Sequence, residues 1–99
     1  MIEIYNTNIQ TNKLEILDKV QRGCWINLVS PSDDEIIYIC KQLEISADYI
    51  KDSLDYEEKA RIDTEEDDGT VLFVIDVPTI EKENESYTYS TMPLGVIIV

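Results

Sequence analysis

The stretch SPSDDEIIYICKQL, residues 30–43, decides the fold because it contains both the start signal and the buried face of an amphipathic helix. Ser32 can cap this helix, and Glu35 stands at the capping-box position. The acidic pair Asp33–Asp34 suits the positive end of the helix dipole. Apolar side chains then recur with helical spacing, at Ile36, Ile39, Cys40 and Leu43. We therefore predict a helix whose single buried stripe packs on a sheet.

The segments on both sides of this helix predict strands and one further helix. Ser46 can cap a shorter helix that ends near Leu54. Strands are predicted at 2–5, 14–17, 24–29, 59–66, 71–77 and from 87 onward, with 71–77 in the centre of the sheet. Pro78 is expected to end that central strand, residues 81–86 to form a polar loop, and Leu94–Val99 to form a buried strand. The order β-β-β-α-α-β-β-β predicts an α/β (α+β) fold, with helices packed on one mixed sheet of about five to seven strands.

Length and charge limit what this chain can be. At 99 residues it is expected to form a single domain, residues 1–99. Its net charge of −13 argues against nucleic acid and against anionic membrane surfaces, which favour Lys and Arg. The same charge permits cations, basic partners or plain solubility. Cys24 and Cys40 lack CxxC spacing and are predicted to be two buried thiols in a reducing compartment.

The residues needed for common catalytic sites are missing. The chain has no His, so neither a Ser/His nor a Cys/His nucleophile pair is possible. With only three Gly it contains no phosphate-binding glycine loop. We therefore expect that the protein is not an enzyme.

Acidic residues are concentrated between positions 52 and 68, in the stretch DSLDYEEKARIDTEEDD. One interpretation is a solvated acidic rim, the usual meaning of such a run. The other is a shallow site for a hard cation, because Mg²⁺ and Ca²⁺ prefer carboxylate oxygens. Asp52 and Asp63 are the candidates for such a site. Arg61 is expected to pair with neighbouring acids, and Trp25 to anchor the core or a sheet face.

Four stretches in a fixed order resemble the N-terminal cytoplasmic domain of CorA-type magnesium transporters. They are CWINLVSPSDDEI (24–36), LEISADYIKDSLD (43–55), KARID (59–63) and STMPLGVIIV (90–99). The resemblance runs from about Cys24 to the end of the chain. It implies a truncated, partial domain, because such transporters continue through further strands, a stalk helix and two membrane helices with a Gly-Met-Asn signature.

The resemblance also implies a location, partners and a site. The chain would lie on the cytoplasmic face of the cell membrane, reaching the membrane only through the missing part. Its partners would be its own C-terminal strands and stalk helix, divalent cations, and neighbouring subunits of a homo-oligomer, a pentamer in the family; nucleic acid would not be among them. Asp52 would be half of a site shared with another subunit, with Mg²⁺ a weak regulatory ligand and no cofactor tightly bound. Lys51 departs from the acidic residue frequent at its position and lowers the expected affinity.

A second function stays open on the sequence. A free-standing acidic interaction module, or an inhibitor that presents carboxylates to a basic partner, would have a similar composition. The reading frame of the gene separates the two, since a transporter frame continues into two hydrophobic segments.

Overall fold

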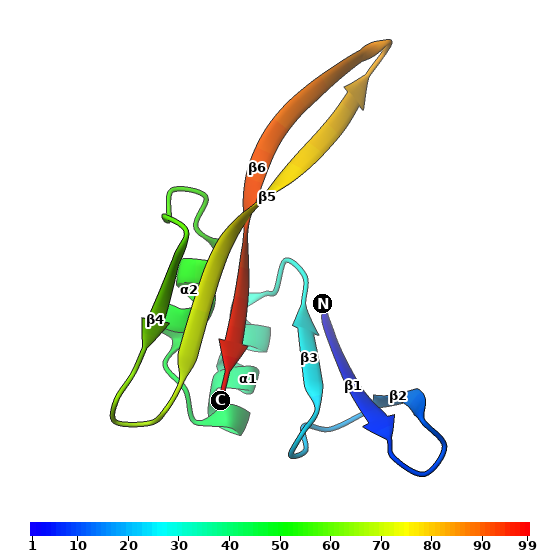
Figure 1. Cartoon of the computed structure of the whole chain (residues 1–99), viewed down its shortest axis with the longest axis vertical. Coiled ribbons are helices and arrows are strands. Elements are labelled where there is room, and N and C mark those ends of the chain that lie inside the picture. Colours follow the sequence, from blue (N-terminus) through cyan, green and yellow to red (C-terminus); the bar gives the residue numbers. More distant parts are fainter. The chain divides into compact units, whose positions relative to one another are not determined.

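The computed structural model describes all 99 residues, which form six strands and two helices in the predicted order (Figure 1). The chain divides into two compact units, residues 1–44 and residues 45–99. Each unit has its own sheet of three antiparallel strands. The single domain over residues 1–99 stays a prediction. Neither helix has the length and apolar character that a membrane crossing requires.

The first unit contains three strands followed by a helix. Strands β1 (Ile2–Asn8), β2 (Lys13–Leu17) and β3 (Trp25–Leu28) lie in the order β2-β1-β3. Helix α1 (Asp33–Leu43) begins as predicted: the Ser32 side chain accepts a hydrogen bond from the Glu35 N–H, and the Glu35 carboxylate accepts one from the Ser32 N–H. Ile36 and Ile39 of its apolar stripe are buried, whereas Cys40 and Leu43 are half-buried. The helix prediction is confirmed.

The second unit contains a helix and a sheet that extends into a long ribbon. Helix α2 (Ala47–Leu54) precedes strands β4 (Arg61–Thr64), β5 (Val71–Glu83) and β6 (Ser86–Ile98), which lie in the order β4-β5-β6. β5 is therefore the central strand, as predicted. β4 pairs with β5 only as far as Val74, so the rest of β5 pairs with β6 alone. Figure 1 shows this part as a twisted two-stranded ribbon.

Several predictions about the sheet are wrong. The six strands do not join one mixed sheet of five to seven strands; they form two smaller antiparallel sheets. Pro78 does not end β5, which continues to Glu83. Beyond Val74 the strand has a neighbour on one side only, and a strand edge tolerates a residue without an N–H. The expected loop at 81–86 shrinks to a turn at Asn84–Glu85, where Asn84 adopts a positive φ of 56°.

Helix α2 covers one face of its sheet. Leu72 and Val74 are buried on that face, which also carries Gly95 because Gly95 pairs with Val74. A Cβ atom built at Gly95 would lie 1.8 Å from the Ser53 Oγ atom, so the helix touches the strand at this point. Ile50 of α2 is also buried. The core of the second unit therefore lies between α2 and the base of the β5–β6 hairpin.

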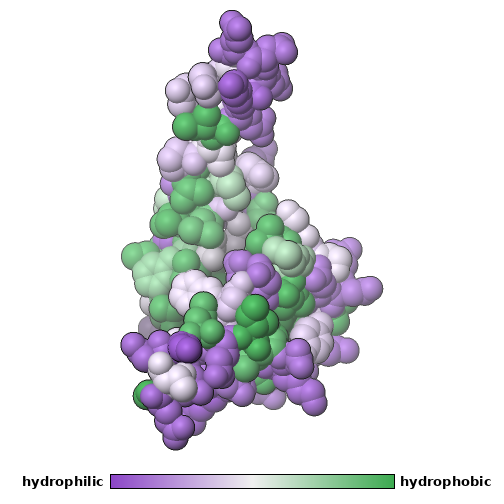
Figure 2. Space-filling view, turned by 90° about the vertical axis from the view of Figure 1, so that its right-hand side faces the viewer, coloured by the Kyte–Doolittle hydropathy of each residue, from purple (hydrophilic) through white to green (hydrophobic).

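The last strand and Trp25 are more exposed than predicted. Leu94 and Ile98 are exposed, and Val96 is half-buried, because they point to the sheet face opposite α2. Figure 2 shows a hairpin with a hydrophilic tip and a more hydrophobic stem. Trp25 is 66% exposed and shares a sheet face with Tyr5, so it is a sheet-face residue and not a core residue. The two cysteines are half-buried rather than buried.

Candidate functional site

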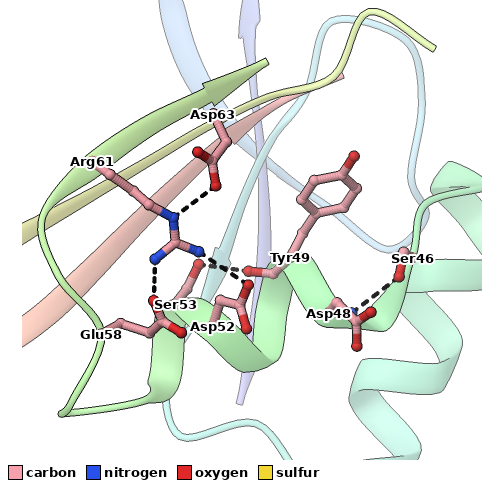
Figure 3. Close-up of polar contacts among 8 residues, drawn as sticks. All are labelled: Ser46, Asp48, Tyr49, Asp52, Ser53, Glu58, Arg61 and Asp63. Atoms are coloured by element: carbon pink, nitrogen blue, oxygen red, sulfur yellow. Dashed lines mark hydrogen bonds and ion pairs between the residues drawn. The ribbon is translucent and has the colours of Figure 1, made fainter. Parts of the chain in front are cut away.

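The last turn of α2 positions Asp52. The helix begins at Ser46, whose hydroxyl accepts a hydrogen bond from the Asp48 N–H at 3.2 Å. Near the end of the helix, the Ser53 hydroxyl donates to the Tyr49 carbonyl at 2.8 Å. Asp52 is half-buried, and its carboxylate points toward the start of β4 (Figure 3). The helix therefore holds this carboxylate in a fixed position beside the sheet.

Arg61, the first residue of β4, connects three carboxylates. Its Nη2 atom lies 3.1 Å from Asp52 Oδ2, and its Nε atom lies 2.7 Å from Asp63 Oδ2. Its Nη1 atom donates to the Glu58 carboxylate, which comes from the segment between α2 and β4. All three contacts are ion pairs (Figure 3). We call Asp52, Glu58, Arg61 and Asp63 the Arg61 cluster.

The electrostatics of the Arg61 cluster favour the charged guanidinium. Hydrogen bonds to Asp63 and Glu58 raise the pKa of Arg61 above its already high ordinary value. Three carboxylates surround one guanidinium, so the cluster retains two negative charges. Because Arg61 is about 29% exposed, solvent weakens each of these ion pairs. The cluster can therefore still attract a cation, though weakly.

Asp52 is already bound to a cationic group of its own chain. A metal ion that approaches Asp52 competes with Arg61 or uses the remaining lone pairs of the carboxylate. Lys51, the residue before Asp52 on the helix, is exposed and forms no ion pair. No three Asp, Glu or Cys side chains of the structure converge in a way that could hold a metal ion. The structure therefore contains no complete metal site, and Asp52 as a ligand of a shared site stays a prediction.

Tyr49 lies near the acidic turn that joins β4 to β5. Partial burial raises the pKa of Tyr49, and the negative charges of Asp68, Glu65 and Asp63 raise it further. The turn is held by hydrogen bonds from the Thr70 N–H to Asp68 Oδ1 and from the Gly69 N–H to the Glu65 carbonyl. This negative potential covers the region next to the Arg61 cluster. It adds to the attraction for cations without supplying a metal ligand set.

Sequence reasoning identified most of the Arg61 cluster. The pairing of Arg61 with neighbouring acids is confirmed, and the structure brings Asp52 and Asp63 to the same guanidinium. Arg61 and Asp63 are two residues apart in a strand and so share a face, a signal that was available in the sequence. Glu58 was missed, because it lies in an irregular segment whose path no local pattern indicates.

Comparison with known proteins shows that the fold is similar to that of a solved structure. No protein-family model matches the chain, and no curated protein matches it. Among solved structures, the chain is similar to the complete structure of the CorA magnesium transporter from Methanocaldococcus jannaschii, with 25% sequence identity and a TM-score of 0.70. The fold is CorA-like. The likeness covers 99% of this chain and 29% of the transporter chain, so this chain spans less than a third of the transporter's length.

At this coarse level, the CorA-like prediction is supported by the arrangement of helices and strands. The similarity suggests a CorA-related domain and supports the predicted link to metal transport. The regulatory role, the cation site and the oligomer stay predictions.

Proposed function

We propose that this chain is a regulatory cytoplasmic domain of a CorA-like transporter of divalent cations, with Mg²⁺ as the ligand that it senses. The observation that carries the proposal is the structural likeness to a CorA magnesium transporter over 99% of the chain. The charge of −13 and the Arg61 cluster supply the chemistry for attracting cations. The transport itself would be performed by parts of the protein other than this chain.

In this proposal, Asp52 contributes half of a cation site at a contact between subunits. A neighbouring subunit supplies the other carboxylate, and a Mg²⁺ ion that keeps most of its waters lies between the two. The shared cation screens the repulsion between acidic surfaces and stabilises the closed assembly. When Mg²⁺ falls, this repulsion loosens the contact and favours the open state, which is a shift between two existing conformations.

Arg61 sets the sensitivity of this site. Its guanidinium holds Asp52 at 3.1 Å and neutralises part of the charge that a metal would otherwise meet. A carboxylate that already carries one partner binds a hydrated ion less strongly. We therefore propose a weak site, with a Kd for Mg²⁺ around millimolar or weaker in the isolated chain. This range suits a sensor that releases its ligand readily.

The experiment is a titration of the isotope-labelled chain with MgCl₂, followed by NMR chemical shifts at constant ionic strength. We expect saturable shifts centred on Asp52 and its neighbours in the Arg61 cluster. Asp52→Asn should abolish these shifts. Asp48→Asn is the matched control, because Asp48 lies on the same helix, is exposed and belongs to no ion pair. Shifts spread over all acidic residues and unchanged by Asp52→Asn would contradict the proposed site.

A further inference from the structure

The three carboxylate partners of Arg61 lie at very different distances along the chain. Glu58 lies three residues before Arg61 and Asp63 lies two residues after it, on the same face of β4. Asp52 lies nine residues before Arg61, on α2. Two of the ion pairs are therefore local and require only the backbone around β4. The third exists only while α2 and β4 keep their places relative to each other.

The Asp52–Arg61 pair is also the only hydrogen bond or ion pair that joins α2 to β4. The helix packs instead on the other two strands of its sheet, where Ser53 touches Gly95 and where Leu72 is buried. Loss of the Asp52–Arg61 pair would thus separate the end of α2 from β4. The packing that holds the helix on β5 and β6 would stay in place.

The chain between α2 and β4, residues 55–60, depends on the same guanidinium. We call residues 55–60 the connecting segment. It contains no helix or strand, and none of its side chains is buried. Its hydrogen bonds run within the segment or to the last turn of α2. Its link to β4 is the ion pair between Glu58 and Arg61, and Arg61 in turn is held to α2 by Asp52. The guanidinium therefore fixes both ends of the connecting segment.

We propose that a divalent cation at Asp52 displaces the Arg61 guanidinium and thereby releases the connecting segment. The inference rests on the proposed function, in which Asp52 binds Mg²⁺. A divalent ion and a guanidinium on one carboxylate repel each other, because both are positively charged. Arg61 can leave Asp52 without losing all its partners, since its pairs with Glu58 and Asp63 are local. Neither Asp52 nor Arg61 is left without a partner of opposite charge.

This exchange would turn the binding of a cation into a change of order within the chain. Without the cation, the pair between Asp52 and Arg61 ties α2 to β4 and orders the connecting segment. With the cation bound, that tie is absent and the connecting segment is free to move. A transition of one segment between order and disorder is a common way for a bound ligand to signal to the rest of a protein. The connecting segment would then report whether the site at Asp52 is occupied.

The test is NMR relaxation of the ¹⁵N-labelled chain, which gives a backbone order parameter for each residue. In the metal-free parent, the connecting segment should show values near about 0.85, as in rigid backbone. Asp52→Ala removes the tie to α2 and should lower these values below about 0.6. Asp63→Ala is the matched control: it removes one carboxylate from the same guanidinium but keeps the pair between Asp52 and Arg61. Its connecting segment should stay as rigid as in the parent.

MgCl₂ provides the second arm of the experiment, at constant ionic strength. Saturating Mg²⁺ should loosen the connecting segment of the parent as Asp52→Ala does, and should change nothing further in Asp52→Ala. Unchanged amide shifts of β5 at Leu72 and Val74, in each variant and with Mg²⁺, show that the sheet remains folded. The comparison thus separates release of the connecting segment from general unfolding.

Four results would overturn the proposal. The first is a connecting segment that stays rigid in Asp52→Ala, and the second is equal loosening in Asp52→Ala and Asp63→Ala, which would reflect lost charge and not a lost tie. The third is a set of saturable Mg²⁺ shifts at Asp52 with no loosening; this would leave the proposed function standing and exclude the exchange alone. The fourth is the absence of any Mg²⁺ shift at Asp52, which would contradict the proposed function and the exchange together.

Discussion

Ser53 on α2 and Gly95 on β6 approach so closely that no side chain fits between them. A Cβ atom at position 95 would lie 1.8 Å from Ser53 Oγ and 2.1 Å from Ser53 Cβ, far inside van der Waals contact. The same helix carries Asp52, the residue immediately before Ser53 in the sequence. The glycine in β6 thus lets α2 come near enough to the sheet for Asp52 to reach Arg61.

Replacement of this glycine should therefore destabilise the second unit. Gly95→Ala is expected to lower the free energy of unfolding by about 2 kcal/mol or more, since the helix must move away from the strand. Urea denaturation measures the change. In the double variant Gly95→Ala/Ser53→Gly the overlapping side chain is gone, so the two changes should cost less together than the sum of the single variants. Strictly additive effects would contradict the close approach.

Replacement of Arg61, the positively charged residue shared by the three carboxylates, should strengthen metal binding. Arg61→Gln leaves Asp52, Glu58 and Asp63 without their shared guanidinium, so Mg²⁺ should bind more tightly by about three- to tenfold, corresponding to roughly 1 kcal/mol. Lys51→Gln changes the net charge equally but removes no ion pair, so its effect should be much smaller. Isothermal calorimetry with MgCl₂ compares the two. Equal gains in both variants would indicate a general charge effect and exclude a special role for Arg61.

Stability at acidic pH should depend on Glu35. Its hydrogen bond with the Ser32 N–H and its contact with the Met1 amino group lower the pKa of Glu35 below 4.5. The stability that this carboxylate contributes is thus fully present above that pH and is lost as the pH falls through the lowered pKa. Glu35→Gln should be less stable than the parent at pH 6, and the difference should shrink toward pH 2.

Denaturant unfolding across that pH range checks this dependence. Asp34→Asn is the control, because Asp34 lies in the same first turn but forms neither of these contacts. At pH 6, Asp34→Asn should cost less stability than Glu35→Gln. A Glu35→Gln difference that stays constant with pH would contradict the assignment.

Burial of the α1 stripe gives a further prediction. Ile39 is 2% exposed, and Ile37, two residues earlier on the same helix, is 51% exposed. Ile39→Asp should lower the free energy of unfolding by about 3 kcal/mol or more, because it buries a charge without a partner. Ile37→Asp makes the same chemical change at the surface and should cost less than about 1 kcal/mol. Thermal unfolding of both variants measures the contrast; similar losses would contradict the placement of the stripe.

Local signals in the sequence were sufficient for the helices and for part of the Arg61 cluster. The Ser32–Glu35 capping box and the spacing of Ile36 and Ile39 depend on residues within one or two turns, and the structure confirms both. The pairing of Arg61 with Asp63 follows from their positions two apart in one strand. Such features survive in any fold that the rest of the chain adopts.

Local signals in the sequence could not predict which strands pair with each other. The division into two sheets depends on which edges meet, and side-chain alternation is the same for one large sheet as for two small ones. The ribbon beyond Val74 could not be predicted either, because Pro78 is incompatible with a central strand but not with an edge. The exposure of Leu94 and Ile98 has the same origin, since an apolar run shows no sign of which of its faces a helix will cover.

The sequence by itself determined the order of the elements, where the two helices begin, and the acidic character of the second unit. Each of these depends on neighbouring residues or on composition alone. Only the tertiary structure decided that Asp52 meets Arg61 across nine positions, that Gly95 admits α2, and that the uncharged strand β6 lies at an edge. These relationships join residues from different elements, and they exist only once burial of Leu72 and Val74 has brought the helix and the sheet together.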